Sequence, residues 1–425
     1  MSNKIKFPKI LIVSSNNLSD YSATNITLRS IFSFWPKSEL LIVTTSQPKI
    51  LFAETVVLDT KIFRNVREFF LKIIFKKNEI QADVNVVPGK ILTSNENNTS
   101  LKSKIYTIGA SYSDIIIRYN ITNELLNKTK AFSPDYIYTD ANNIKMIKLV
   151  NYLGDFLNVP ILIHFMDDWP ETRYTGNLFL LIPRLILRKS LKELLKKSKQ
   201  SICISEKMCR IYEERYKTQF FPLMNIVDSK ILKYNQPVLK KDNNFISIQY
   251  FGGLHLNRWK TIKIIDELLN DSEFITYNIK LLIYTNNTNK VKYSGIYTNK
   301  VIFKDEVDHK MVIEEMKKSD YLLHIESFDD DILPFIRYSI STKIPEYLAS
   351  KKPIIAIGPY NSASIEYLHK NGCAYVVTSY SKETIKELLL SFNDYKNEQF
   401  VNNAITLVKK NHTENNVFEF INWLK

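Results

Sequence analysis

Short apolar runs alternate with amphipathic helical stretches along almost the whole chain, and this alternation limits the possible fold more than any other feature of the sequence. The apolar runs have the length and the β-branched content of buried parallel strands. They cover residues 9–15, 40–45, 135–140, 160–165 and 200–205 in the first half, and 245–253, 280–285, 301–305, 320–325, 353–358 and 374–379 in the second. Apolar residues at three-to-four spacing predict helices between them, over 141–157, 259–270, 308–318, 343–350, 362–371 and 382–391. Regular alternation of strands and helices predicts an α/β fold with open, doubly wound sheets.

A polar stretch, 228–244, separates the two series of strands and has the composition of a linker. The 425 residues are enough for two domains of ordinary size. We therefore predict two Rossmann-like domains that face a cleft, residues 1–230 and 240–410, with a C-terminal helix, 411–425, that packs back on the first. Since ligands of such sheets bind at the carboxyl ends of the strands, candidate site residues are expected just after each strand.

The positive charge of the chain lies mostly in its first half. Residues 1–225 hold 32 Lys and Arg against 20 Asp and Glu, whereas residues 226–425 hold 26 against 24. The candidate partners of such a surface are nucleic acid, an anionic membrane and a phosphorylated substrate. The most basic stretch, 178–199, has apolar residues at helical spacing and a single acidic residue, and its cations are Arg184, Arg188, Lys189, Lys192, Lys196, Lys197 and Lys199. A helix of this kind can lie on an anionic membrane surface, and the alternative is a domain helix with a solvated basic face.

The sequence shows no recognisable pattern for disulfide bonding, export, membrane insertion, metal binding or nucleic-acid recognition. Its three cysteines, Cys203, Cys209 and Cys373, are sparse and odd in number, which favours reduced thiols and a cytosolic location. We recognise no signal peptide and no segment able to span a bilayer. No Cys/His cluster has metal-binding spacing, so neither a metal nor another cofactor is expected. No nucleic-acid recognition motif is present either, and nucleic acid is not an expected partner.

The segment Ser341-Thr342-Lys343-Ile344-Pro345-Glu346 has the features of a phosphate-binding helix start. Proline is tolerated in a first helical turn, and Ser341 or Thr342 is a suitable N-cap. Free amides at such a start can hold a phosphate, and Lys343 adds a full charge. Lys343 and Glu346 are three residues apart and share a helix face, so they could hold a diphosphate and a ribose diol together. The alternative is a surface ion pair on a capped helix.

A second phosphate-type element follows the strand predicted at 245–253. Here Gly252 and Gly253 form a turn, and Arg258 comes just before the next helix. Two glycines permit a close approach of the backbone to a ligand, and an arginine can bind phosphate through two hydrogen bonds. The chain contains only 9 Gly, which favours a specific role for the pair over a plain turn.

These segments, in this order, resemble the GT-B glycosyltransferases of the retaining, glycogen synthase-like "family four" group, and especially members that build bacterial surface polysaccharides. The residues that carry the resemblance are YFGGLHLNRWK, VIFKDEVDHKMVIEEMKKSDYLLHIES, STKIPEYLASKKPIIAIG and SASIEYLHKNGCAYVV in the second half. KILIVSSNNLSDYSATNITLRSIFSFWPK, ILIHFMDDWPE and ICISEKMCRIYEERY carry it in the first half.

The resemblance implies roles for individual residues of the second half. It implies that Glu346 binds the ribose, that Lys343 and the nearby amides meet the donor diphosphate, and that Arg258 reaches the donor phosphates. Gly252 and Gly253 match the glycine turn of the family. The family has another Glu eight residues before Glu346, where this chain has Tyr338. The residues that could substitute for it near the donor sugar are Glu326, Asp329, Asp330 and Asp331.

In the first half, the strand predicted at 160–165 ends in a histidine and two carboxylates. His164, Asp167 and Asp168 suit acid–base chemistry or hydroxyl binding. The resemblance matches His164 loosely to a histidine beside the donor sugar. The alternative is a core histidine, with Asp167 or Asp168 capping the next turn. After the first strand, small polar residues that include Asp20 and Ser22 could let backbone amides approach the donor phosphate or the acceptor, and the alternative for Asp20 is a helix N-cap.

The function implied is transfer of a sugar from a nucleotide-sugar to a hydroxyl of a glycan or of a lipid-linked glycan. Retention of configuration is favoured, because the resembling family retains it. An inverting enzyme would need a protein base, for which Asp167 and Asp168 are the candidates. Two alternatives stay open, a GT-B-like nucleotide-sugar epimerase and a non-enzymatic, basic nucleic-acid-binding protein.

Overall fold

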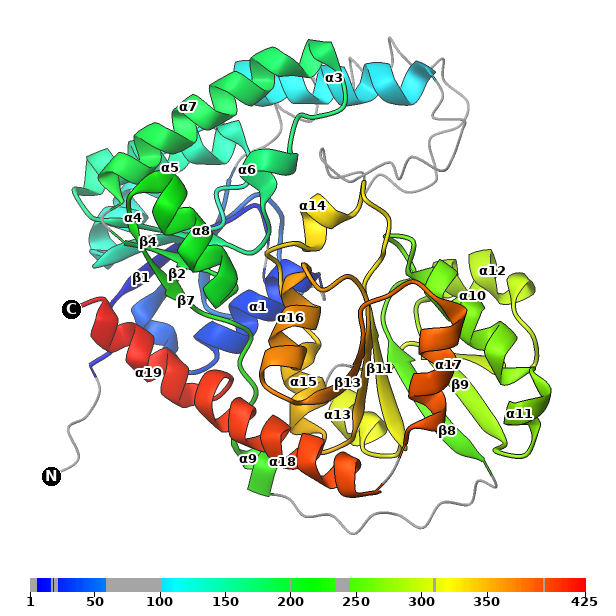
Figure 1. The fold of residues 1–425 in the computed structure, drawn as a ribbon. Coiled ribbons are helices and arrows are strands. Elements are labelled where there is room, and N and C mark those ends of the chain that lie inside the picture. The colour runs from blue at the N-terminus through cyan, green and yellow to red at the C-terminus, as the bar shows by residue number, and fades with distance from the viewer. Residues whose placement is uncertain are drawn as a thin grey trace, which may run out of the picture. The chain divides into compact units, whose positions relative to one another are not determined.

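The computed structural model describes residues 6–16, 18, 22–58, 101–198, 200–233, 245–308, 311–392 and 394–425 of the chain. The chain divides into two compact units (Figure 1). Unit 1 comprises Met1–Leu223 together with Val417–Lys425, and unit 2 comprises Met224–Asn416.

Unit 1 is built on a seven-stranded parallel sheet with the order β3-β2-β1-β4-β5-β6-β7. Five of its strands were predicted: β1 (Ile10–Val13), β2 (Leu40–Thr44), β4 (Tyr136–Thr139), β5 (Ile161–Phe165) and β6 (Gln200–Cys203). The sequence did not predict β3 (Glu54–Val57) and β7 (Gln219–Pro222). These two are the edge strands of the sheet and are only partly buried, so they carry no continuous apolar run.

The helices of unit 1 include a group of three, α3 (Leu101–Ile116), α5 (Ile144–Leu157) and α7 (Leu181–Lys197), that pack against one another (Figure 1). The other helices are α1 (Ala23–Phe32), α4 (Asn123–Phe132), α6 (Trp169–Thr172) and α8 (Glu206–Tyr216), with the 3₁₀ turns η1 (Lys37–Glu39) and η2 (Leu178–Leu180).

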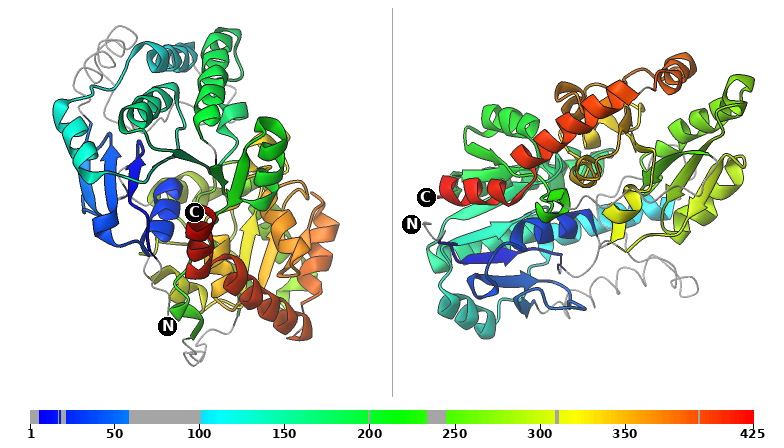
Figure 2. Two further views of the ribbon diagram at one scale, coloured as in Figure 1. Left: turned by 90° about the vertical axis from the view of Figure 1, so that its left-hand side faces the viewer. Right: turned by 90° about the horizontal axis from the view of Figure 1, so that it is seen from below.

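The C-terminal helix α19 (Glu414–Trp423) contributes its last turns to unit 1. The Tyr136 hydroxyl donates to the carbonyl of Leu424 at 2.6 Å, and the side-chain Nε2 of Gln200 donates to the carbonyl of Trp423 at 3.2 Å. The ring of Phe7 also contacts that of Phe418. The C-terminus therefore lies beside the start of β1 (Figures 1 and 2).

Unit 2 holds a six-stranded parallel sheet with the order β10-β9-β8-β11-β12-β13. All of its strands were predicted: β8 (Ile246–Phe251), β9 (Ile279–Tyr284), β10 (Val301–Lys304), β11 (Tyr321–Ile325), β12 (Ile354–Ile357) and β13 (Ala374–Val377). Its helices are α9 (Lys230–Lys233), α10 (Arg258–Leu269), α11 (Ser272–Ile275), α12 (Asn287–Tyr293), α13 (Val312–Met316), α14 (Leu333–Ile336), α15 (Ile344–Ala349), α16 (Ala363–Lys370), α17 (Lys382–Leu390) and α18 (Asp394–Asn411), with the 3₁₀ turn η3 (Ser294–Ile296).

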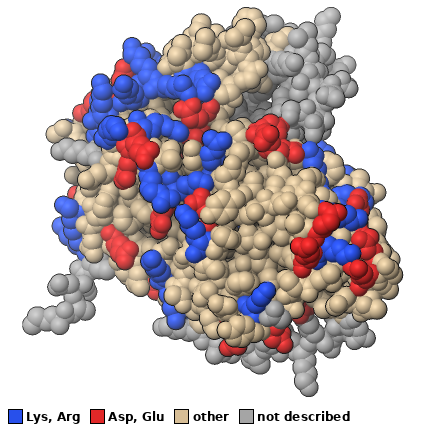
Figure 3. Space-filling model, in the orientation of Figure 1, with Lys and Arg blue, Asp and Glu red and all other residues tan. Residues whose placement is uncertain are grey.

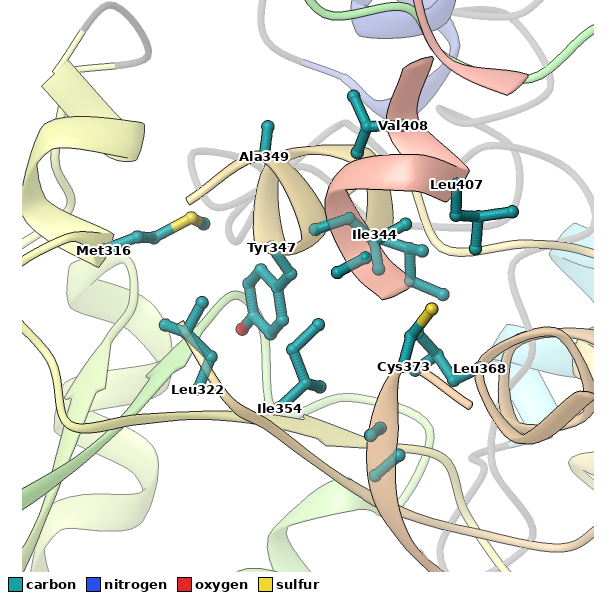
Figure 4. Close-up of a cluster of buried hydrophobic side chains, with 14 of the residues drawn as sticks. Met316, Leu322, Ile344, Tyr347, Ala349, Ile354, Leu368, Cys373, Leu407 and Val408 are labelled. Carbon is teal, nitrogen blue, oxygen red and sulfur yellow. The ribbon is translucent and has the colours of Figure 1, made fainter. Parts of the chain in front are cut away.

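The sheet of unit 2 is buried on both faces, and successive strand residues enter different cores. On β12, Ile354 and Ala356 pack into one cluster with α13, α15 and α18, whereas Ile355 and Ile357 pack into the other with α10 and α17. Figure 4 shows the first cluster around Tyr347. This burial on both faces explains why the strands could be recognised as continuous apolar runs. Two parallel-sheet α/β units confirm the predicted fold class.

Both sheets reverse their strand order next to their first strand. In unit 1 the chain runs outward from β1 to β3 and then returns to β4 on the other side of β1, and in unit 2 it does the same from β8 to β10 and back to β11. The gaps between β1 and β4 and between β8 and β11 are the topological switch points of the two sheets. Crevices outside the carboxyl ends of the strands at such points are where doubly wound sheets bind ligands.

Candidate functional site

At the switch point of unit 2, a lysine side chain lies directly over a glycine. The backbone of Gly252 has a φ of 131°, and a Cβ placed there would lie 2.4 Å from the Nζ of Lys343. A Cβ on Gly253 would lie 2.4 Å from the Nδ1 of His255. The positive φ favours glycine at position 252, where a side chain would also displace Lys343 from the end of β8, whereas a side chain at position 253 would displace His255.

Lys343 is half-buried and makes no ion pair with any residue that the structure describes. Burial, together with the nearby charge of Arg258, lowers the pKa of its ammonium to about 8, although Glu346 and Glu326 act in the opposite direction. At neutral pH the ammonium is still mostly protonated. A cation that is partly desolvated, close to a second cation and without a carboxylate partner is a favourable place for an anion.

Arg258 begins α10 and is held rigidly at the end of β11. Its Nε donates to the carbonyl of Ile325 at 3.0 Å, and its Nη2 donates to Glu326 Oε2 at 3.0 Å. Glu326 Oε1 lies 3.3 Å from His324 Nε2, and the Glu326 side chain is only 3% exposed. Burial by itself would raise the pKa of Glu326, but Arg258 and His324 outweigh it and lower that pKa to about 2. Glu326 therefore positions Arg258.

Backbone hydrogen bonds, rather than a side-chain cap, hold the start of the segment that carries Lys343 and Glu346. The helix predicted to start near residue 342 begins at Ile344, and neither Ser341 nor Thr342 caps it through a side chain. Instead, the Ser341 amide donates to Ser364 Oγ at 3.0 Å, and the Thr342 carbonyl accepts from Asn225 Nδ2 at 3.4 Å.

The Tyr347 hydroxyl joins the two strands of the switch point. It accepts from the amide of Phe251 on β8 and donates to the carbonyl of Leu323 on β11, both at 3.1 Å. Ile344, Tyr347 and Leu348 are buried, as predicted (Figure 4). Lys343 and Glu346 are half-buried, so they lie outside this core.

The loop after β11 is tied to the start of α10. Asp329 Oδ2 accepts from Lys260 Nζ at 2.6 Å and from Asn257 Nδ2. Asp330 and Asp331 are exposed, and Tyr338 is half-buried. Of the acidic residues proposed to substitute for the missing Glu, Glu326 and Asp329 thus have structural partners within unit 2.

In unit 1, His164 lies in the core. Its side chain is fully buried, its Nδ1 contacts the Tyr138 hydroxyl, and its Nε2 has no hydrogen-bond partner in the part of the chain that the structure describes. Burial lowers the pKa of His164 to about 3, so the ring is neutral. The structure supports the interpretation of His164 as a core histidine and gives no support to a catalytic role.

The two aspartates after β5 differ in their surroundings. Asp168 is 5% exposed, and its Oδ1 accepts from the Tyr212 hydroxyl at 2.6 Å and from Arg215 Nη1 at 2.9 Å, which fixes α8 to this turn. Asp167 is exposed, and its Oδ1 accepts from the amide of Trp169 at 3.1 Å. Of the residues predicted to be catalytic, Asp167 alone presents an accessible carboxylate.

The predicted acceptor loop is described only in part. Asp20 lies outside the described residues. Ser22 is the N-cap of α1, where its hydroxyl accepts from the Asn25 amide at 3.3 Å. This cap accounts for the position of Ser22.

Asp140, which the sequence analysis did not select, lies at the switch point of unit 1 directly after β4. Its side chain is 5% exposed, Oδ2 accepts from Asn16 Nδ2 at 3.0 Å, and Oδ1 has no hydrogen-bond partner among the described residues. Burial raises the pKa of Asp140 to about 6, although the neighbouring polar groups of Ser14 and Asn16 and the charge of Arg173 act to lower it. The signal in the sequence was an aspartate that ends the apolar run 135–140.

The basic stretch predicted to form an amphipathic helix is η2 followed by α7. Its apolar residues divide into two groups: Leu187, Leu191, Leu194 and Leu195 are buried, whereas Leu178, Phe179, Leu181, Ile182 and Leu185 are between 52% and 89% exposed. Arg184 and Arg188 bond to Glu171, and Lys197 bonds to Asp155. Lys189, Lys192 and Lys196 are exposed without an ion pair in the described ranges, and Lys199 lies outside them. Figure 3 shows basic side chains gathered over this helix.

None of the helices in the described ranges is both long enough and apolar enough to cross a membrane. No group of three or more His, Cys, Asp or Glu side chains in the same ranges is arranged to hold a metal ion.

The architecture of both units is that of the GT-B fold, as comparison with solved structures shows. Among the similar structures are HepE from Anabaena in complex with UDP-glucose (13% identity, 98% of this chain and 99% of that chain, TM-score 0.59) and the sucrose-phosphate synthase of Thermosynechococcus elongatus (11%, 98% and 98%, 0.59). A third is the UDP-forming α,α-trehalose-phosphate synthase of Burkholderia vietnamiensis (10%, 98% and 99%, 0.60). No protein-family model and no curated protein sequence matches the chain.

We predict that Glu326→Gln destabilises the protein by about 3 kcal/mol at pH 7, because it leaves Arg258 buried without a counter-charge. The stabilisation from Glu326 is present above the unfolded pKa, near 4.3, and is lost as pH falls toward 2. Chemical denaturation at pH 7 and pH 3 measures both effects. Glu314→Gln, in a surface pair with Lys317, is the control. Equal stability of wild type and Glu326→Gln at pH 7 would contradict the prediction.

We predict that Asp140→Asn, unlike Glu326→Gln, stabilises the folded protein near neutral pH. The folded protein binds the proton of Asp140 more tightly than the unfolded chain, so wild-type stability falls as pH rises from about 4 through 6. Asparagine cannot ionise, so the variant keeps its stability as pH rises. It should be more stable than wild type by about 2–3 kcal/mol at pH 7.5, with little difference at pH 4. Denaturation curves at the two pH values measure it, with the exposed Asp155→Asn as control. A variant less stable than wild type at pH 7.5 rules the prediction out.

Proposed function

We propose that this protein is a glycosyltransferase that moves a sugar from a nucleotide-sugar donor to a hydroxyl of a glycan or a lipid-linked glycan. The observation that carries the proposal is the pair of cations at the switch point of unit 2, with Lys343 over Gly252 and without an ion-pair partner among the described residues. The GT-B architecture supports the proposal, since HepE, which has this fold, was determined with UDP-glucose, UDP, and UDP with glucose. A bacterial polysaccharide role is consistent with that likeness.

The donor diphosphate is assigned to Lys343 and Arg258, and the ribose to Glu346. During transfer the bond between the anomeric carbon and the diphosphate oxygen breaks, and the acceptor oxygen bonds to that carbon. The leaving diphosphate gains negative charge, which two preorganised cations stabilise more than they stabilise the bound donor. These cations supply the charge that a metal ion would otherwise supply, so no metal is part of the proposal.

The stereochemical course follows from where the acceptor proton goes. In a retaining reaction, which we favour from the sequence resemblance, the leaving phosphate takes the proton on the face where the sugar departs, and no protein nucleophile is required. In an inverting reaction the exposed carboxylate of Asp167 is the candidate base. Analysis of the anomeric configuration of the product distinguishes the two courses.

The surface formed by η2 and α7 supports attachment to the cytoplasmic face of an anionic membrane. The five exposed apolar side chains at its N-terminal end can enter the headgroup region, and Lys189, Lys192 and Lys196 can contact anionic headgroups. The backbone of η2 is held to α3, because the Tyr112 hydroxyl donates to the Phe179 carbonyl at 3.1 Å. Each such cation contributes about 1 kcal/mol near an anionic leaflet, which gives reversible attachment.

We predict that Lys343→Met weakens UDP binding by about 1.5–3 kcal/mol, because one charge-assisted contact to the diphosphate is lost. In wild type, UDP affinity should fall above about pH 8, as the free protein loses the Lys343 proton, and the variant should lack this dependence. Isothermal calorimetry with UDP at pH 7 and pH 9 measures both effects.

Uridine and Lys409→Met are the controls for this experiment. Uridine carries no diphosphate, so its affinity should not change with Lys343→Met. Lys409 is an exposed lysine of α18, and its substitution changes the net charge equally. If the affinities for uridine and UDP fall equally in Lys343→Met, the assignment of the diphosphate to Lys343 is wrong.

We predict that the protein co-sediments with vesicles that contain anionic lipid at low salt and not with neutral vesicles. Replacing Leu178, Phe179 and Ile182 with Ser should abolish this binding, and replacing Lys189, Lys192 and Lys196 with Gln should reduce it about tenfold or more, since three contacts near 1 kcal/mol each are removed. Gln at Lys300, Lys304 and Lys409 of unit 2 controls for net charge. No binding to anionic vesicles at low salt would end this part of the proposal.

A further inference from the structure

The switch point of unit 1 holds a buried carboxylate that the fold leaves half-satisfied. Asn16 and Asn142 both donate to Asp140 Oδ2, at 3.0 and 3.4 Å, while no described residue donates to Oδ1. Folded proteins seldom leave a buried carboxylate oxygen without a hydrogen bond, because the loss of hydration is not compensated. A ligand that donates a hydrogen bond to Oδ1 would remove this cost, and Asp140 lies where doubly wound sheets bind ligands.

A buried arginine lies close to the same carboxylate. Arg173 is 9% exposed, forms no ion pair with a described residue, and its charge acts on the carboxyls of both Asp140 and Asp167. Asp140 follows β4 and Asp167 follows the neighbouring strand β5, so the arginine faces the carboxyl edge of the sheet at these two strands. A guanidinium near two carboxylates that it does not contact still has donors to offer to a ligand.

The position of Arg173 is set by a rigid anchor at the next residue. The backbone of Tyr174 has a φ of 56°, and its hydroxyl donates to Asp114 Oδ2 at 2.6 Å. Asp114 is in turn paired with Lys145 at 2.7 Å, and both side chains are at most 7% exposed. This buried group connects the turn after α6 to α3 and α5. Strained backbone held by a buried polar group is frequent at binding sites.

We propose that Asp140 and Arg173 form a binding site for neighbouring hydroxyls of the acceptor sugar. Asp140 accepts a hydrogen bond from one hydroxyl through Oδ1, and Arg173 donates to the oxygen of the next. Asn16 and Asn142 are half-buried and both bond to Oδ2, which leaves Oδ1 to the ligand. The proposal rests on the proposed glycosyltransferase function, but it concerns unit 1 alone, whereas the donor residues Lys343, Arg258 and Glu346 belong to unit 2.

Saturation-transfer NMR of the full chain tests the site, with methyl glycosides of glucose, galactose, mannose and N-acetylglucosamine as probes at millimolar concentration. At least one glycoside should give a signal with wild type at pH 7.5, and that signal should fall at least fivefold in Asp140→Asn and in Arg173→Met. Asp155→Asn, on the exposed surface of unit 1, and Lys343→Met, in the donor site, should keep it. Thermal melting establishes that each variant is folded.

The outcomes separate this proposal from the assignment of the donor site. Absence of any glycoside signal with wild type, or an unchanged signal in folded Asp140→Asn and Arg173→Met, overturns the acceptor site. Loss of the signal in Lys343→Met together with its retention in Asp140→Asn also overturns it, because the sugar then binds in unit 2. UDP binding is measured separately by calorimetry, so a protein that binds the glycoside through Asp140 but does not bind UDP retains this site and loses the proposed function.

Discussion

The ion pair between Arg258 and Glu326 is the interaction on which the candidate donor site depends. Glu326 is buried at the end of β11, and Arg258 uses two of its nitrogens on Glu326 and on the adjacent carbonyl. This carboxylate is bonded to Arg258, and Lys343 lies over Gly252 with no ion pair to any described residue. Lys343 is therefore a partly desolvated cation, and we propose that Lys343, rather than Arg258, gains a partner when an anion binds.

The two switch points have the same strand order, but one presents mainly cations and the other mainly carboxylates. In unit 2, cations gather where β8 and β11 end, which suits a diphosphate. In unit 1, the carboxylates Asp140 and Asp167 follow β4 and β5 with Arg173 near them, which suits the hydroxyls of a sugar. A single chain thus uses one architecture twice, and the residues that follow the strands decide what each sheet can bind.

How far the sequence predicted the site depended on the kind of residue. The glycine pair and the Lys343 segment were recognisable because glycine and an early helical proline have few other uses in a strand–helix turn. For His164 the sequence left a catalytic role and a core position open, because a histidine in an apolar strand can face either side and periodicity could not show that it contacts Tyr138. Asp140 was overlooked, because an aspartate after a strand is usually a turn or capping residue, and only its missing hydrogen bond in the folded chain distinguishes it.

The sequence by itself determined the α/β class, all the strands of the second sheet, the central strands of the first, and the two segments that bring Gly252 and Lys343 to the ends of strands. Buried parallel strands are continuous apolar runs, so local composition was sufficient to find them. The tertiary structure decided which polar groups became partners: Glu326 with Arg258, Asp168 with Tyr212 and Arg215, and Asp114 with Lys145 and Tyr174. Those pairings join residues far apart in the sequence. Lys343, which has no ion pair in the described ranges, and Asp140 Oδ1, which has no hydrogen bond there, are defined only once every other pairing has been made.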